Sequence, residues 1–409
     1  MNIITGGVTA PKGFQAAGIH CGIKDNFTTP QPDKKDLAMI LSSVPCAAAG
    51  TYTRNVVKAD PVILTKEHLA DHQARGIIFD SGNANACAPN GPEHAEAMCA
   101  AVAAVTGRQA EDFAVASTGV IGVALNIKAI QDSVPALASA LSIGGSNAAA
   151  EAIMTPDTVL KEIAIETTIG GKIVRLGAIC KGAGMICPNM GTMLCFITSD
   201  CAITSDMLFS ALHEVVPRTF NRVTVDGDTS TNDACVVLCN GSAGNPLIDW
   251  KDDNYNIFKD ALMYVCTYMA RAIAADGEGA SHLLTCTVSG SRSEEAAERL
   301  AKAVVGSNLV KAAMFGADAN WGRVLCAMGY SRAPFRPDRV DASFYSSAGR
   351  IQVCKDGSAV EFDEDLAKKI LSEEEVSIII NVNEGDCTAT CWGCDLTYDY
   401  VRINGDYRT

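Results

Sequence analysis

Residues 181–197 read KGAGMICPNMGTMLCFI, a loop rich in glycine, proline and asparagine that runs directly into a short apolar strand. Gly191 and Thr192 form the peptide bond at this junction. Glycine has no Cβ, so the Gly191 carbonyl can be approached closely and held in conformations closed to other residues. Self-cleavage of a peptide bond needs such freedom, although a Gly-Thr pair before a strand is usually only a turn.

The hydroxyl of Thr192 is suited to attack the bond that precedes it. Attack on the Gly191 carbonyl would move the acyl group from nitrogen to oxygen, and water would then release a new chain that starts at Thr192. The α-amine of that residue has a reference pKa of about 7.7–8.0, so a fraction is neutral near pH 7 and can accept the hydroxyl proton. The junction therefore offers a nucleophile that needs no histidine.

Amphipathic helices and short strands alternate on both sides of the junction. Helical spacing of apolar residues recurs in four segments, and strand-like runs recur in four others; the helical ones are 95–102, 207–215, 258–269 and 297–304, and the strand-like ones are 76–80, 192–198, 377–382 and 395–403. Ser291 and Glu294 are spaced as a capping box for the last helix. We expect a layered α/β fold with more than one sheet, and a smaller C-terminal α/β domain that begins near residues 285–295.

The composition excludes several classes of protein. The 409 residues include 33 Lys and Arg against 47 Asp and Glu, a net charge of −14 that excludes a basic nucleic-acid binder. No apolar stretch is long enough to span a bilayer, and the first residues lack the apolar core of a signal peptide. Seventeen cysteines, an odd number spread from Cys21 to Cys394, indicate reduced thiols. We expect a soluble cytoplasmic protein.

Common cofactor and metal motifs are absent from the sequence. It has no GxGxxG turn, no GxxxxGK[ST] phosphate loop, no HExxH helix and no GxSxG elbow. The acidic segment 226–233 resembles a calcium loop, but Thr231 stands where the turn glycine is needed, so a hydrogen-bonded polar loop is favoured. Cys387, Cys391 and Cys394 include one CxxC pair that could hold a metal or cycle as a redox pair, but buried thiols fit the strand-like context better.

Nine segments together resemble one protein family. The stretch KGAGMICPNMGTML is similar to the processing-site signature of the ornithine acetyltransferases, which are glutamate N-acetyltransferases of arginine biosynthesis. Eight further segments match the same family in order: GGVTAPKGFQAAGIHCGIK (6–24), DSGNANAC (80–87), STGVIG (117–122), MTPDT (154–158), TVDGDTSTNDA (224–234), DGEGASH (276–282), ANWGRVLCAMGYS (319–331) and DLTYDYVRINGDYRT (395–409). The resemblance covers essentially the whole chain.

The resemblance implies a fold and a set of site residues. The fold would be a layered α-β-β-α sandwich, and cleavage would leave an α chain of residues 1–191 and a β chain of residues 192–409. Thr192 would be the nucleophile, and Thr118 and Gly119 would stabilise the oxyanion, a contribution commonly worth roughly 3–4 kcal/mol per donor. The family's substrate contacts fall on Thr155, Lys181, Thr192, Glu278, Asn404 and Thr409.

The resemblance also implies a reaction. N-acetylornithine would donate its acetyl group to Thr192, ornithine would leave, and glutamate would accept the group, with no metal or organic cofactor. Lys181 and Glu278 are candidate counter-charges for these substrates, whose side chains differ in sign. Members of the family differ in whether acetyl-CoA also serves as donor, and they assemble as paired αβ units, α2β2. No nucleic-acid or membrane partner is expected.

The chain departs from the family pattern at three positions, and two other functions are compatible with its sequence. Gly191 replaces the usual alanine, Pro156 interrupts the usual Thr-Thr-Asp-Thr, and Ala319 replaces a proline before Asn-Trp-Gly-Arg. An alternative within the same chemistry is an N-terminal-nucleophile amidohydrolase or aminopeptidase, in which water is the final acceptor. A more distant alternative is a metal or redox module built on the C-terminal cysteines.

Overall fold

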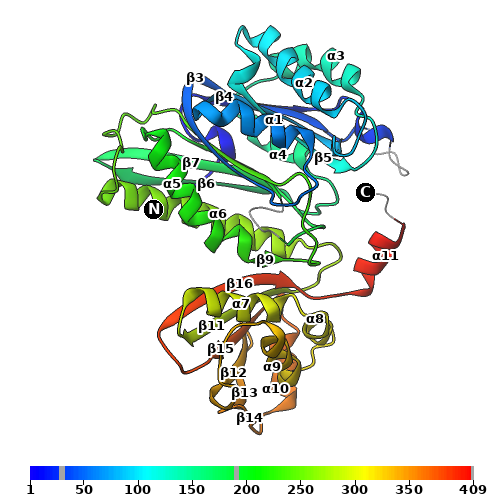
Figure 1. Cartoon of the computed structure of the whole chain (residues 1–409), viewed down its shortest axis with the longest axis vertical. Coiled ribbons are helices and arrows are strands. Elements are labelled where there is room, and N and C mark those ends of the chain that lie inside the picture. The colour runs from blue at the N-terminus through cyan, green and yellow to red at the C-terminus, as the bar shows by residue number, and fades with distance from the viewer. Residues whose placement is uncertain (27–32, 188–192, 407–409) are drawn as a thin grey trace.

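The computed structural model describes residues 1–26, 33–187 and 193–406, whose strands form two mixed sheets (Figure 1). The larger, nine-stranded sheet has the order β1 (Asn2–Ile4), β6 (Lys161–Ile169), β7 (Lys172–Lys181), β8 (Leu194–Ser199), β10 (Ala234–Cys239), β3 (Leu37–Tyr52), β4 (Gln73–Asn83) and β5 (Phe113–Val120), with β2 (Phe14–Ile19) paired to β3. The seven-stranded sheet has the order β14 (Ser358–Ala359), β13 (Gly349–Lys355), β12 (Asp341–Ser346), β15 (Glu375–Asn381), β11 (Leu283–Ser291), β16 (Cys387–Cys394) and β9 (Val223–Thr224).

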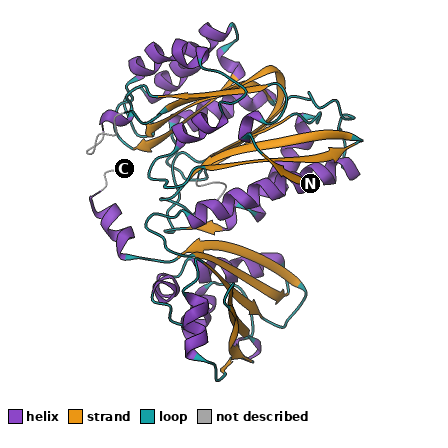
Figure 2. Cartoon of the chain, turned by 180° about the vertical axis from the view of Figure 1, so that it is seen from behind, coloured by secondary structure: helices purple, strands orange, loops and turns teal. Residues whose placement is uncertain are grey.

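The described residues form eleven α-helices, and all but the last pack on a sheet. They are α1 (Asp60–His68), α2 (Gly91–Thr106), α3 (Ile127–Ser139), α4 (Ser146–Ile153), α5 (Ser205–Val215), α6 (Asp253–Ala275), α7 (Glu294–Val305), α8 (Asn308–Phe315), α9 (Trp321–Tyr330), α10 (Glu364–Leu371) and α11 (Tyr398–Asp406). Apolar residues of α2 and α3 pack on β3, β4 and β5, while those of α5 and α6 pack on β6, β7, β8 and β10. The smaller sheet lies at one end of the molecule, with α7 to α10 against it (Figure 2).

The long strand β3 bends the larger sheet upon itself. Its first half pairs with β2 and its second half with β10 along the same edge, and its pairing with β4 slips in register between Leu41 and Cys46. Two strands separate β4 from β8 in the sheet order, which would keep them about 14 Å apart in a flat sheet. The rings of Phe79 on β4 and Phe196 on β8 nevertheless pack against each other, with centroids 4.7 Å apart and an angle of 36° between their planes, so the two halves face each other.

The four predicted helices are confirmed, with one error at a helix start. Helix α2 ends at Gly107, which adopts a left-handed φ of 68° as a C-cap glycine should. The predicted capping box at the start of α7 is wrong, because Ser291 is the last residue of β11. The cap is Ser293, whose hydroxyl accepts the Ala296 N–H at 3.1 Å.

Three of the predicted strands coincide with β4, β8 and β15, although residue 192 lies outside the described residues. The strand predicted at 395–403 is wrong, since residues 398–406 form α11. The Thr397 hydroxyl accepts the Tyr400 N–H and so starts a helix. Tyr398 and Val401, which suggested a strand, are 82% and 65% exposed and pack on no sheet.

The cysteines are free thiols, most of them buried. Cys391 and Cys394 lie three residues apart on β16, so their side chains leave opposite faces of the strand. Cys391 joins the core of the smaller sheet and Cys394 the core that contains α6. The CxxC pair is therefore a strand with buried thiols, as the sequence favoured. No helix of the described chain has the length and hydropathy needed to cross a membrane.

Truncation of Phe196 to alanine should test the packing between the two halves of the larger sheet. Phe196 is fully buried against Phe79, so we expect Phe196→Ala to lower the free energy of unfolding by about 3–5 kcal/mol in urea denaturation. Phe209 is 42% exposed, so Phe209→Ala serves as the matched control and should cost about 1 kcal/mol or less. Equal losses in the two variants would contradict the described packing.

Candidate active site

A pocket of about 90 Å³ opens where six segments of the chain meet. Its walls come from the end of β5, the α4–β6 connection, the end of β7 with the loop that follows it, the loop before β10, the α6–β11 connection and α11. Six residues predicted from the sequence line it, namely Thr118, Gly119, Thr155, Lys181, Glu278 and Asn404. Ser230, Thr231 and Asn232 also line it.

Three of the predicted residues, Gly191, Thr192 and Thr409, lie outside the described residues. A recess of about 20 Å³ shares Thr118 and Lys181 with the pocket and is also lined by Met193, the residue that follows Thr192 in the sequence. The described chain therefore brings the residue next to the predicted nucleophile to the predicted oxyanion and substrate residues.

The end of β5 is shaped by glycine. Gly119 pairs with Gly82 of β4 at a φ of +134°, and a Cβ at this position would lie 2.3 Å from the Gly82 carbonyl carbon. Only glycine fits there, because both the conformation and the space exclude a side chain. The Asn232 amide donates to the Ser117 carbonyl at 2.8 Å and so holds this strand end against the loop before β10. The neighbouring Thr118 is buried beside the pocket.

The acidic segment 226–233 is a hydrogen-bonded loop, as predicted. The Asp226 carboxylate accepts the N–H groups of Met185, Ile186 and Asp228 at 2.7, 2.9 and 3.1 Å. Burial raises the pKa of this carboxyl, and these N–H donors act in the opposite direction. The loop thus fixes the backbone of residues 185–186, which lead toward the junction.

The same loop anchors the chain on both sides of residues 188–192. On one side the Thr229 hydroxyl donates to the Cys187 carbonyl at 2.7 Å, and on the other the Ala234 N–H donates to the Met193 carbonyl at 3.0 Å. Two residues only five apart along the loop therefore hold both ends of the segment that contains the predicted cleavage site.

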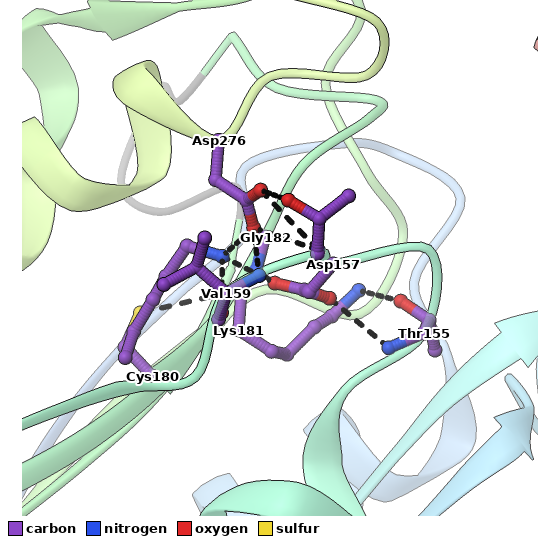
Figure 3. A network of polar contacts seen from close by, with 9 residues as sticks. Thr155, Asp157, Val159, Cys180, Lys181, Gly182 and Asp276 are labelled. Atoms are coloured by element: carbon purple, nitrogen blue, oxygen red, sulfur yellow. Dashed lines mark hydrogen bonds and ion pairs between the residues drawn. The ribbon is translucent and has the colours of Figure 1, made fainter.

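Lys181 reaches the pocket beside a buried carboxylate (Figure 3). Its ammonium group donates to the Thr155 hydroxyl at 3.1 Å. The Asp157 carboxylate accepts the Gly182 N–H at 2.8 Å, the Thr155 N–H at 3.0 Å and the Lys161 ammonium at 2.7 Å. Asp157 thus binds the backbone next to Lys181 and the backbone of the residue that Lys181 contacts.

A second carboxylate completes this buried ion cluster. The Lys161 ammonium, almost fully buried, also pairs with Asp276. Asp276 in turn accepts the backbone N–H groups of Thr158 and Val159 and the Thr158 hydroxyl. The cluster joins the α4–β6 connection to the end of α6, the segment that continues to Glu278.

Burial and neighbouring charges have opposite effects on the pKa of each of these groups, and the net direction differs between them. Burial opposes ionisation of Asp157, but Lys161, Lys181 and the Gly182 N–H outweigh burial and lower the pKa of Asp157 to about 2. Burial likewise tends to lower the pKa of Lys161, but Asp157 and Asp276 raise it above its usual value. Burial lowers the pKa of Lys181, and Asp157 opposes that effect.

Glu278 also lines the pocket. It is 8% exposed, and its carboxylate accepts the Asn404 amide at 2.7 Å, which ties α11 to the pocket. Burial raises the pKa of Glu278. A Cβ on Gly184 would lie 2.2 Å from Glu278 Oε1, so Gly184 leaves the space that the carboxylate fills. The pocket is therefore lined by both a cation and an anion.

Within the described residues, no group of three or more His, Cys, Asp or Glu side chains is arranged to hold a metal ion. The polar groups of the pocket are instead one ammonium, one carboxylate, hydroxyls and amides. This set suits a polar substrate that carries charges of both signs.

Comparison with known proteins establishes the family of the chain. Residues 15–409 match the ArgJ family. The chain belongs to this family. It is 50% identical to the arginine biosynthesis bifunctional protein ArgJ of Symbiobacterium thermophilum and 43% identical to the glutamate N-acetyltransferase of Methanocaldococcus jannaschii, over the full length of each chain. The predicted acetyltransferase of arginine biosynthesis is thereby confirmed.

A solved structure agrees with the assignment. A chain from the structure of the arginine biosynthesis bifunctional protein ArgJ of Bacillus halodurans is 43% identical to this chain, with a TM-score of 0.50. The match covers 98% of that chain but 52% of this one. The solved chain of that ArgJ relative is thus about half the length of the chain described here.

Sequence reasoning missed part of the site. Asp157, Asp276 and the residues 230–232 stand inside family-like segments but received no role, and Lys161 lies outside those segments. Asp157 and Lys161 are four residues apart, a spacing that brings side chains together on a helix, but they lie in the connection to β6 and at its first residue, so the spacing did not predict the pair. Its link to Asp276, more than a hundred residues away, has no local signature.

Substitution of Gly184 tests whether the Glu278 carboxylate must lie where it does. We expect the added Cβ of Gly184→Ala to displace that carboxylate. The value of kcat/KM for N-acetylornithine should then fall by about tenfold or more, which corresponds to about 1.4 kcal/mol or more. A Cβ on Gly329 of α9 would lie in open space, so Gly329→Ala should leave kinetics unchanged. Wild-type kinetics in a folded Gly184→Ala enzyme would rule out this role of the pocket.

Proposed function

We propose that the pocket transfers an acetyl group from N-acetylornithine to glutamate through an acyl-enzyme on Thr192. The observation that carries the proposal is the pair of opposite charges, Lys181 and Glu278, that line one small pocket. Both substrates carry a carboxylate for Lys181, while ornithine substrates also carry an ammonium group for Glu278. The adjoining recess shares Lys181 with this pocket and is lined by Met193, the residue after Thr192.

The transfer takes place in two steps on one hydroxyl. The Thr192 hydroxyl attacks the acetyl carbonyl, its α-amine takes the hydroxyl proton, and that proton passes to the leaving amine as ornithine departs. The amine of glutamate then attacks the ester, and N-acetylglutamate leaves with the hydroxyl restored. One amide is broken and one is formed, so the site has to position the acceptor and exclude water from the ester.

Thr118 and Gly119 are proposed to stabilise the oxyanion of both steps. The close approach of Gly119 to Gly82 and the Asn232 bond to Ser117 support this role, because they fix the backbone of the strand end. Donors that are fixed before the reaction need no reorganisation when charge develops on the oxygen.

Cleavage between Gly191 and Thr192 is proposed to generate the nucleophile. Two features support it: the anchoring of Cys187 and Met193 by one loop, and the half-length chain of the Bacillus halodurans relative. Hydrogen bonds at Cys187 and Met193 fix the chain before and after residues 188–192. Positioning of this kind favours attack by a side chain on the peptide bond next to it.

Further parts of the proposal rest on the family resemblance together with the packing. We propose an α-β-β-α arrangement of layers, which the contact of Phe79 with Phe196 supports, and a smaller C-terminal domain from near residues 285–295. The α and β chains, 1–191 and 192–409, would pair as α2β2 in the cytoplasm, where thiols stay reduced. Acetyl-CoA as a second donor is proposed from the bifunctional relatives.

The nucleophile is tested by Thr192→Ala. The variant lacks the attacking hydroxyl, so we expect a single chain of 42.9 kDa by intact mass and no acetyl transfer. Thr168 is exposed on β6, and Thr168→Ala should be processed normally. Normal processing of Thr192→Ala would remove Thr192 from its proposed role.

The charge on the Glu278 side is tested by Glu278→Gln. The amide can still bond Asn404 but carries no charge, so kcat/KM should fall at least tenfold more for N-acetylornithine than for glutamate. Glu162→Gln, a half-buried glutamate away from the pocket, is the control and should alter neither. Equal losses for both substrates would show that Glu278 does not recognise the ammonium group.

A further inference from the structure

We propose that the buried Asp157–Lys161–Asp276 cluster is the positioning element that keeps Lys181 charged and aimed at the substrate carboxylate. The inference rests on the proposed function, because it takes Lys181 to be the group that pairs with that carboxylate. None of the three residues of the cluster lines the pocket, so each acts through Lys181 or the backbone around it.

The geometry places Lys181 under the control of one carboxylate. Asp157 accepts hydrogen bonds from the N–H of Gly182, the residue after Lys181, and from the N–H of Thr155. The Thr155 hydroxyl in turn accepts a hydrogen bond from the Lys181 ammonium. Asp157 is therefore bonded to the backbone beside the start of the Lys181 side chain and to the backbone of the residue at its tip (Figure 3). A shift of Asp157 would move both ends together.

The net charge of the cluster also favours a cation beside it. Asp157 and Asp276 carry two negative charges and Lys161 one positive charge, so the three side chains leave one net negative charge next to Lys181. The charged groups that face Lys181 are Asp157, Asp233 and Glu278, which stabilise its ammonium form, and Lys161, which opposes it. Asp157 is the foremost of the stabilising groups.

Stability alone does not account for such a cluster. Burying three charges has a desolvation cost of several kcal/mol per ion, and apolar residues of similar volume often replace a buried ion pair without loss of stability. A negative charge next to a buried lysine has a direct effect on binding instead, since a neutral amine cannot pair with a carboxylate. Without it, burial would release the Lys181 proton at lower pH.

The inference predicts a shift in a pH profile. Asp157→Asn keeps the size of the side chain and an oxygen acceptor but removes the charge. The alkaline limb of kcat/KM for N-acetylornithine, where Lys181 loses its proton, should move to lower pH by about one unit or more. The loss should appear mainly as a higher KM, and it should affect N-acetylornithine and glutamate alike because both carry a carboxylate.

The matched control is Asp200→Asn. Asp200 is also a buried carboxylate, and it accepts the backbone N–H groups of Arg175 and Lys12. It lies directly after the last residue of β8, whereas the junction lies before the first. This variant should leave the alkaline limb in place. An unmoved limb in processed Asp157→Asn, or an equal shift in Asp200→Asn, would overturn the inference.

Two further variants separate the inference from the proposed function and protect against a folding defect. Wild-type kcat/KM in Lys181→Met would refute the proposed role of Lys181 itself, whereas loss of activity there with no limb shift in Asp157→Asn would refute only the inference. If Asp157→Asn does not fold, Asp276→Asn decides. Asp276→Asn also removes one negative charge, but from the carboxylate on the far side of Lys161. A smaller shift of the alkaline limb in the same direction supports the inference, and an unmoved limb overturns it.

Discussion

The salt bridge of Lys161 with Asp157 and Asp276 is the interaction on which the pocket depends. It joins the connection after α4 to the end of α6. The first of these segments carries Thr155 and the second leads to Glu278, and both residues line the pocket. Ions this deeply buried require good geometry to offset desolvation, and the backbone N–H groups on both carboxylates provide it. Loss of one partner would leave an uncompensated charge in the interior.

A second constraint concerns the chain around the junction. Asp226 and Thr229 bind the backbone before residues 188–192, and the Ala234 N–H binds the backbone after them. The loop between Asp226 and Ala234 thus acts as a clamp, and its Asn232 also fixes the end of β5. The backbone on both sides of the predicted nucleophile and the strand end that carries the predicted oxyanion donors are thereby held by the same few residues.

The sequence predicted what depends on local pattern or on recognisable motifs. Helix α2 followed from apolar spacing and a terminal glycine, and the motifs gave six residues that the fold brings to one pocket. The last segment was misread because alternating apolar residues were taken as a strand, whereas Thr397 caps a helix whose apolar residues remain exposed. The link of Asp157 to Asp276 could not be predicted, since it joins distant segments that only the folded chain brings together.

The central claim is that Thr192 carries the acetyl group between the two substrates. The most direct measurement is the mass of each fragment after the enzyme is mixed with N-acetylornithine alone. The account predicts one acetyl group on the fragment that begins with Thr192, located on that residue and removed when glutamate is added. An uncleaved active chain, or an acetyl group that resides elsewhere and does not transfer to glutamate, would contradict it.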